Sequence, residues 1–140
     1  RGNTAVPGAA GGRAAVHEAD RARQREVVDA FLAAAREGDF GALVAILDPD
    51  VLLRADGGPT AESATVRGAR AVAGQALRFA RLARYARPAM VNGSVGLVVA
   101  PEGVPVAVMG IAVRDGRVLE LDILADITRL RGLDLTLLDD

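Results

Sequence analysis

The dipeptide Asp115-Gly116 lies between two runs of aliphatic residues, 104–113 and 117–124. Both central residues of a type I′ turn need positive φ, which Asp-Gly tolerates, so the sequence predicts a two-residue β-hairpin at this point. The predicted register pairs Val113 with Val118, Ala112 with Leu119, Ile111 with Glu120, and Met109 with Asp122.

This register divides the hairpin side chains between two faces, because neighbours along a strand alternate. Glu120 and Asp122 would share a face with apolar side chains of the first strand, namely Met109, Ile111 and Val113. The other face would carry Leu119, Leu121 and Ile123. Two apolar-leaning faces predict a sheet covered by helices on one side and by a second subunit or domain on the other. An isologous homodimer is the economical arrangement.

The first two thirds of the chain predict three amphipathic helices. The first runs from about residue 20 to Gly38, and the second is capped by Asp39 and ends at the turn 48–50. The third spans residues 69–84. Four arginines lie away from its buried stripe and favour a solvated face over a partner-binding patch: Arg70, Arg78, Arg81 and Arg84.

Further strands are predicted at residues 51–55, 89–92 and 95–100, each bounded by turn-forming residues. Residues 56–68 are rich in turn formers and predict a long loop, a feature that is often functional. Residues 1–16 show no apolar periodicity. The predicted organisation is therefore α+β, with a flexible linker over residues 1–19 and one domain over residues 20–140.

The composition excludes several classes of protein. A chain of 140 residues without Cys and with one His, His17, suits a single domain and excludes disulfides and multi-histidine metal centres. No cofactor or metal is expected. The balance of 18 acidic and 17 basic residues disfavours direct nucleic-acid contact. Without a membrane span or a signal-peptide core, a cytoplasmic location is predicted.

Three stretches carry a resemblance to a known superfamily: residues 27–50, the strand and turn 51–58 (VLLRADGG), and the strands of residues 91–103 and 106–126. They resemble the nuclear transport factor 2-like superfamily, in which a strongly curved antiparallel sheet packs on three N-terminal helices to form a cone. Within it, they look most like the SnoaL-like domain at the C-terminus of some extracytoplasmic function (ECF) sigma factors.

Two details narrow the resemblance to those sigma factors. Residues 1–19 look like the stretch after the helix-turn-helix promoter-reading region, and Asp56-Gly57-Gly58 matches the start of an Asp-Gly-Gly-Gly-Lys motif of the appended domains. Pro59 and Thr60 replace the second half of that motif. An Asn-Pro-Asp-Lys motif after the last strand is echoed by Asp126.

The same resemblance implies candidate site residues. In similar isomerases and cyclases a pocket carboxylate acts as the base, and Asp56 or Asp122 would take that role here, with an apolar cavity raising the pKa. Helix one offers Phe31 but no tyrosine, and the sole tyrosine, Tyr85, follows helix three. The ligand-pocket candidates are Phe31, Arg54, Asp56, Tyr85, Met109, Glu120 and Asp122.

Simpler interpretations stand beside these. Asp56 before two glycines is typical of a turn-capping carboxylate. Glu120 and Asp122 would lie on a polar rim of the sheet or form an interface salt bridge to Arg54, Arg87 or Arg114, and Met109 would pack in the core.

The favoured hypothesis is a non-catalytic regulatory domain that docks on the promoter-binding domains of its own sigma factor, which binds the RNA polymerase core. Docking would use the loop of residues 56–68, which begins with Asp56, Gly57 and Gly58, and the C-terminal segment of residues 125–140, which includes Asp126. A small apolar ligand would modulate it. The alternatives are a free-standing SnoaL-like cyclase, isomerase or hydrolase, and a ligand-binding or dimerisation module without a transcriptional role.

Overall fold

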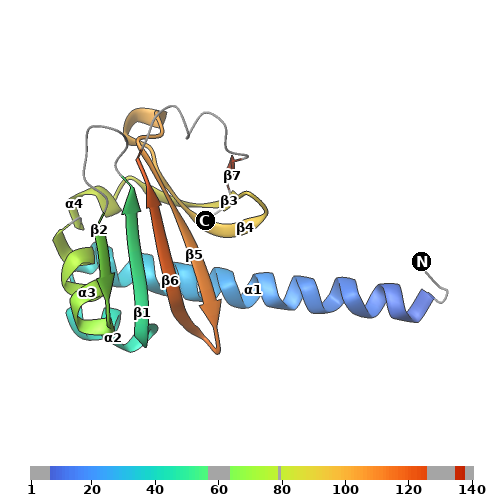
Figure 1. Ribbon diagram of the computed structural model, residues 1–140. Helices are drawn as coiled ribbons and strands as arrows, with labels where there is room; N and C mark the ends of the chain where they lie inside the picture. Colours follow the sequence, from blue (N-terminus) through green and yellow to red (C-terminus); the bar gives the residue numbers. More distant parts are fainter. Residues whose placement is uncertain (1–6, 57–63, 79, 126–134, 138–140) are drawn as a thin grey trace.

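The structure, a computed structural model, describes residues 7–56, 64–78, 80–125 and 135–137, with residues 7–19 and 135–137 described by their backbone alone. Helices come first and strands follow (Figure 1). The helices are α1 (Pro7–Glu37), α2 (Phe40–Ile46), α3 (Ala69–Arg78) and α4 (Ala80–Ala83), with the 3-10 turn η1 (Pro101–Gly103). The strands are β1 (Leu47–Asp56), β2 (Ala64–Arg67), β3 (Ala86–Val91), β4 (Ser94–Val99), β5 (Ala107–Arg114), β6 (Arg117–Leu124) and β7 (Leu135–Leu137).

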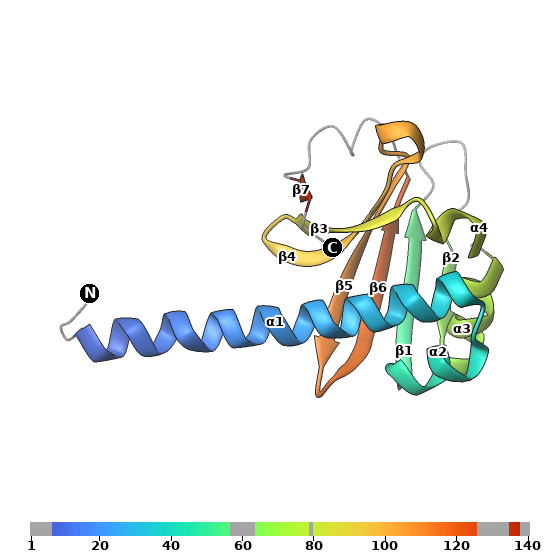
Figure 2. The same ribbon diagram turned by 180° about the vertical axis from the view of Figure 1, so that it is seen from behind.

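The described strands form one sheet in the order β2-β1-β6-β5-β4-β3-β7. All neighbours pair antiparallel except β1 and β6, which are parallel because a long crossover containing β2 to β5 joins them. The strands β3 and β4 curl away from β1 and β6, and α1 crosses one face of the curved sheet (Figures 1 and 2). The predicted α+β fold, with helices against a curved sheet, is confirmed.

Helix α1 begins at Pro7, well before the predicted start near residue 20. The stretch 7–19 lacks an apolar stripe, but it is rich in alanine, and extending a formed helix costs far less than starting one. The helix therefore continues past the sheet that buries its C-terminal half (Figure 1). The prediction that residues 1–19 lack regular structure was wrong from Pro7 onward.

The predicted cap of the second helix is confirmed. The Asp39 carboxylate accepts a hydrogen bond from the Ala42 amide at 3.0 Å, at the start of α2. The predicted turn after this helix lies inside the first part of β1, where the pairing with β6 shifts between Leu47 and Leu52. There the Asp48 carboxylate accepts from the Asp50 amide at 2.8 Å.

The hairpin at Asp115-Gly116 is confirmed, since both residues have positive φ, 53° and 77°. Of the four predicted pairs, only Val113 with Val118 holds, next to the pair Arg114 with Arg117 that flanks the turn. A β-bulge then leaves Leu119 unpaired, so every later pair is shifted by one residue. The observed pairs are Ala112 with Glu120, Ile111 with Leu121, Gly110 with Asp122, and Met109 with Ile123.

This shift overturns the predicted distribution of side chains. Met109 and Ile111 face the helices and pack with Leu121, whereas Glu120 and Asp122 lie on the opposite face of the sheet. The two carboxylates are therefore separated from the apolar side chains with which they were predicted to lie. We call the face turned away from α1 the outer face.

The main core lies between α1 and the inner face of the sheet. Its fully buried side chains come from α1, α2, β1, α3 and β6: Val28, Leu43, Leu47, Val51, Val72, Val118 and Leu121. A smaller cluster on the outer face contains Ala89, Val98 and Val108, with Leu124 against it. Both faces bury apolar side chains, as predicted, whereas the second subunit expected over the outer face stays a prediction.

The loop predicted over residues 56–68 contains an edge strand. Residues 64–67 form β2, which pairs antiparallel with β1, opposite residues 52–55. The prediction of a continuous loop was wrong here, because Thr65 and Val66 are β-branched and find a free strand edge to pair with. Helix α3 follows directly, and the third predicted helix is divided between α3 and α4.

Among the helices that the structure describes, none combines the length and the apolar character needed to span a bilayer.

Candidate functional site

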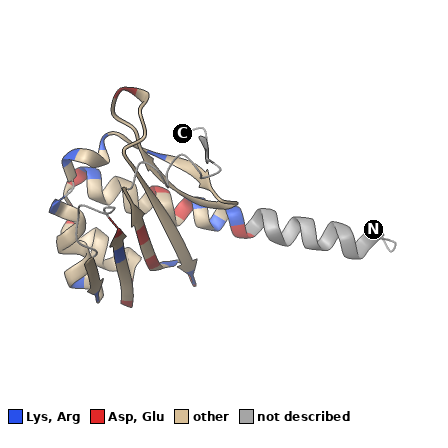
Figure 3. Ribbon diagram, turned by 45° about the horizontal axis from the view of Figure 1, so that its top comes forward, with Lys and Arg blue, Asp and Glu red and all other residues tan. Residues whose placement is uncertain are grey.

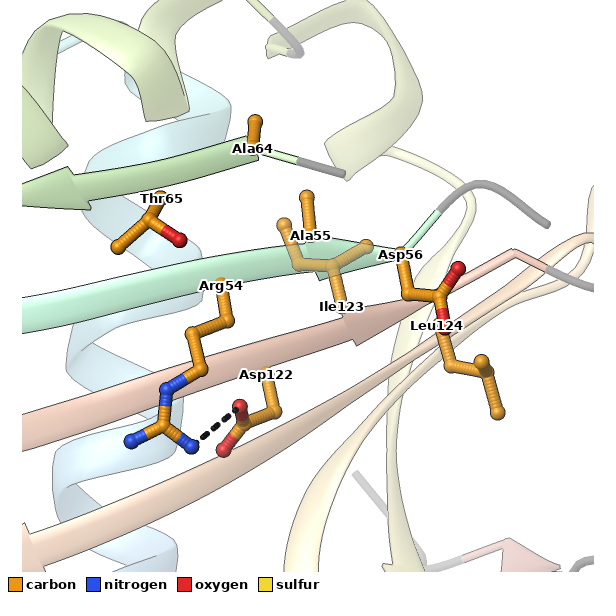
Figure 4. Close-up of a pocket in the computed structure, with 8 residues that line it drawn as sticks. All are labelled: Arg54, Ala55, Asp56, Ala64, Thr65, Asp122, Ile123 and Leu124. Atoms are coloured by element: carbon orange, nitrogen blue, oxygen red, sulfur yellow. Dashed lines mark ion pairs between the residues drawn. The ribbon is translucent and has the colours of Figure 1, made fainter. Parts of the chain in front are cut away.

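A hollow of about 400 Å³ lies where β1 and β6 end and β2 begins (Figure 4). The parallel pairing of β1 and β6 creates it, because both strands end at the same edge of the sheet. Its lining side chains come from these three strands: Arg54, Ala55, Asp56, Ala64, Thr65, Asp122, Ile123 and Leu124.

The polar groups of this hollow point to the outer face. Ala55 packs against the main core, so strand alternation turns its neighbours Arg54 and Asp56 the other way. Figure 4 shows Arg54, Asp56 and Asp122 directed to the same side of the sheet, with Ala55 directed to the other. The expected cavity carboxylate therefore lies at an outward-facing hollow rather than inside the helix-lined core.

Arg54 joins the two carboxylates of β6. Its guanidinium lies 3.3 Å from a Glu120 oxygen and 3.7 Å from an Asp122 oxygen. The register places all three side chains together, since Arg54 pairs with Asp122 and the neighbouring Leu52 pairs with Glu120. Arg54 is thus the salt-bridge partner among the three predicted arginines, and it pairs with both carboxylates within one chain.

Solvent exposure decides what this cluster contributes. The side chains of Arg54 and Asp122 are 55% and 54% exposed, and that of Glu120 is 39% exposed. Ion pairs at this exposure contribute at most about 1 kcal/mol each. The cluster therefore serves to place charge on the outer face more than to hold the sheet together.

The structure separates the other ligand-pocket candidates from this hollow. Phe31 is buried in the main core on α1, and Met109 packs against the same core from the inner face. Tyr85 follows α4, where the Arg84 guanidinium donates to its hydroxyl at 2.9 Å and lies 4.9 Å from its ring centroid. Of the seven candidates, only four share one location: Arg54, Asp56, Glu120 and Asp122.

The candidates Gly57, Gly58 and Asp126 lie outside the described residues, and so does the turn that Asp56 was predicted to cap. The backbone on either side of them is described. The Ala125 amide donates to the Asp56 carbonyl oxygen at 3.0 Å, which continues the pairing of Asp56 with Leu124. The described residues that precede the two segments predicted for docking, Asp56 and Ala125, therefore lie side by side.

Sequence reasoning missed Thr65 and Leu124 as lining residues. Thr65 was assigned to a loop, although the pattern Ala-Thr-Val-Arg at residues 64–67 carries the β-branched residues of a short strand. Leu124 was missed because nothing local in the sequence shows that β1 pairs in parallel beside it.

The chemistry of the hollow is that of an open, mixed surface. Asp122 is more than half exposed and already paired with a guanidinium, whereas a base for carbon acids works in an enclosed, water-poor pocket. Arg54 and Thr65 offer donors, and Ile123 and Leu124 offer apolar contact. This combination suits contact with a polypeptide or a small amphiphilic ligand.

No protein-family model and no curated protein matches the chain. Among solved structures, the extracytoplasmic function sigma factor SigJ of Mycobacterium tuberculosis matches with a TM-score of 0.65 and 29% identity. The match covers 79% of this chain but 44% of that one, so this chain spans less than half of the length of SigJ.

Two further structures agree with the architecture. A putative polyketide cyclase from Sinorhizobium meliloti has a TM-score of 0.51 and 26% identity, covering 70% of this chain and 93% of that one. A nuclear transport factor 2-like protein of unknown function from Mesorhizobium loti has a TM-score of 0.53 and 16% identity, covering 76% and 93%. The chain therefore has the cone-like nuclear transport factor 2-like fold, and its structural neighbours include both a sigma factor and a putative enzyme.

Proposed function

We propose that this chain is the regulatory C-terminal domain of an ECF sigma factor and modulates transcription initiation without catalysing a reaction. The observation that carries the proposal is the similarity to SigJ, at 29% identity over 79% of this chain. The partners would be the promoter-binding domains of the same polypeptide, which in turn bind the RNA polymerase core.

The edge at which β1 and β6 end supports docking at that place. Asp56 and Ala125, the last described residues before the two proposed docking segments, are joined by a backbone hydrogen bond. Both lie at the strand ends beside the hollow lined by Arg54 and Asp122, so docking at this edge would involve both segments.

Attachment to the same polypeptide makes a weak docking surface sufficient. A tethered partner is held at an effective concentration in about the millimolar range, so even a modest interface is occupied. A ligand in the hollow would shift the docked population only if its affinity differs between the docked and undocked states. The domain would then act as an attached anti-sigma factor.

The similarity to a putative polyketide cyclase raises catalysis as a rival function. The geometry supports it less. The carboxylates of Asp56 and Asp122 face outward. Phe31, the candidate residue on α1, is buried in the core, and its side chain has no hydrogen-bond donor. Among the described lining residues, Arg54 and Thr65 could donate hydrogen bonds to an enolate in this hollow. The hollow faces outward, so water would compete with these donors.

The proposed function predicts that deleting residues 126–140 from the full-length sigma factor raises transcription from its own promoter. Loss of about 1 kcal/mol of docking free energy would raise the active fraction about fivefold. The measurement is promoter-specific transcription in vitro with RNA polymerase core, beside a promoter served by another sigma factor.

Because this deletion removes β7, a second variant replaces residues 57–63 with a Gly-Ser segment of equal length. The proposal expects both variants to raise transcription while keeping the circular dichroism of the parent. Output unchanged in both, with the fold intact, would overturn docking at this edge.

A further inference from the structure

The basic residues of this chain are strongly segregated. Residues 63–101 contain six arginines and no acidic residue, so the rest of the chain has 11 basic residues against 18 acidic ones. All six arginines are exposed: Arg67, Arg70, Arg78, Arg81, Arg84 and Arg87. A near-neutral chain thus carries one distinctly cationic region.

Three of these arginines lie on α3 and α4, and Arg84 directly follows α4. Helix α3 buries Val72 and Ala73 and packs Leu77 against the main core, whereas the arginines of both helices are exposed. Figure 3 shows blue bands gathered along α3, α4 and the adjacent β2. We call this surface the arginine face and define it by Arg70, Arg78, Arg81 and Arg84.

Two of the four guanidinium groups of this face lie over aromatic rings, and none forms a salt bridge with a described carboxylate. Arg70 lies 5.3 Å from the centroid of the Phe40 ring, and Arg84 lies 4.9 Å from that of Tyr85. The salt bridges found among described residues involve Arg25 and Arg54, and none involves the arginine face. Its positive charge is therefore unmatched by any described acidic side chain.

Exposed apolar side chains accompany this charge. The large hydrophobic residues that are exposed in the described part of the chain are Leu82, Val104 and Val106, at 41%, 63% and 42%. Leu82 lies on α4, and Arg84 directly follows this helix. The segment that contains the two valines starts beside the end of α4, because the Ala100 amide donates to the Tyr85 carbonyl and the Tyr85 amide donates to the Leu82 carbonyl.

We propose that the arginine face, with Leu82 at its centre, binds an acidic segment of a protein partner. An amphipathic helix would set carboxylates against the guanidinium groups and an apolar residue against Leu82, which is the mixture of charge and apolar contact found at protein interfaces. This inference rests on charge and exposure alone and holds whether or not the domain belongs to a sigma factor.

Nucleic acid fits this surface less well. A phosphate backbone would use the arginines but would leave three large apolar side chains exposed or unmatched. The remainder of the chain is net acidic and would repel a long polyanion. An acidic amphipathic segment would pair with the arginines and would also cover the exposed apolar side chains. It would need to cover only α3, α4 and the neighbouring loop.

The test measures binding of a fluorescein-labelled helical peptide of about 18 residues, or five turns, with glutamates on one side and leucines on the other. Fluorescence anisotropy with the whole chain, at about 50 and 200 mM salt, reports affinity and its charge dependence. A DNA duplex of about 20 base pairs is titrated in parallel.

Two charge-reversed variants separate a specific face from general attraction. Arg81→Glu with Arg84→Glu alters the arginine face, whereas Arg114→Glu with Arg117→Glu makes the same charge change at the exposed β5–β6 hairpin. The proposal expects at least about tenfold weaker peptide binding for the first pair and less than about twofold for the second. Leu82→Ser, which leaves the charge unchanged, should also weaken binding.

Three results would overturn the proposal. Equal losses in both charge-reversed variants would show nonspecific attraction, and tighter binding of the duplex would assign the face to nucleic acid. No peptide binding at millimolar concentration would show that the face is solvated only.

Discussion

Phe31→Ala is expected to lower the free energy of unfolding by about 3–5 kcal/mol, the usual cost of removing a buried aromatic side chain. Phe31 is 3% exposed and belongs to the core between α1 and the inner face of the sheet. Truncation would leave a void that the rigid α1 and the sheet cannot close. Urea denaturation followed by circular dichroism measures the change.

Tyr85→Phe is the matched control. Tyr85 is the other aromatic ligand-pocket candidate, it is half-buried, and this substitution keeps its ring. It loses only the hydroxyl to which Arg84 donates, and we expect a change within about 0.5 kcal/mol. A Phe31→Ala protein of parental stability would show that this side chain lines an accessible pocket, as the resemblance to isomerases implied, rather than filling the core.

Gly96→Ala is expected to cost about 2–3 kcal/mol, because the neighbouring strands leave no room for a side chain there. A Cβ atom at Gly96 would lie 2.4 Å from the Met109 carbonyl oxygen and 3.1 Å from a methyl group of Val91. A backbone atom cannot move aside without disturbing the pairing of β4 with β5, so the cost is that of overpacking. Thermal and urea unfolding would measure it.

Gly110→Ala tests the same idea from the facing strand. Gly110 pairs with Gly96, but a Cβ atom there would meet its nearest neighbour, the Asp122 carbonyl oxygen, at 3.9 Å. Alanine should be neutral or stabilise by up to about 1 kcal/mol through the reduced entropy of the unfolded chain. Equal effects at the two glycines would contradict a steric restriction that is specific to Gly96.

Local signals predicted most of the fold correctly. The cap at Asp39, the hairpin at Asp115-Gly116 and the apolar periodicity of α1 each depend on a few neighbouring residues, so the sequence carries them directly. The α+β class and the curved sheet follow from the order of helices and strands together with the family resemblance.

The register of the hairpin could not be predicted, because no residue near the turn indicates the β-bulge at Leu119. A two-residue turn fixes only the first pairs, and one extra residue then moves every later side chain to another partner. This single difference moved Glu120 and Asp122 away from Met109 and Ile111 and gave them Arg54 as a neighbour.

The candidate site was beyond local reasoning for a similar reason. Its hollow depends on the parallel pairing of β1 with β6, whose partners are separated by more than 60 residues of sequence. The sequence identified Arg54, Asp56, Glu120 and Asp122 as chemically suited, but their common location is a property of the assembled sheet. Three further candidates have side chains of a type that suits a ligand pocket, but they lie away from the hollow: Phe31, Tyr85 and Met109.

The claim that this domain belongs to a sigma factor is tested most directly by sequencing the genomic DNA upstream of the codon for Arg1. The account predicts an uninterrupted reading frame that encodes a helix-turn-helix promoter-reading region ending in basic residues. A start codon immediately before Arg1, or a different domain in frame, would contradict it.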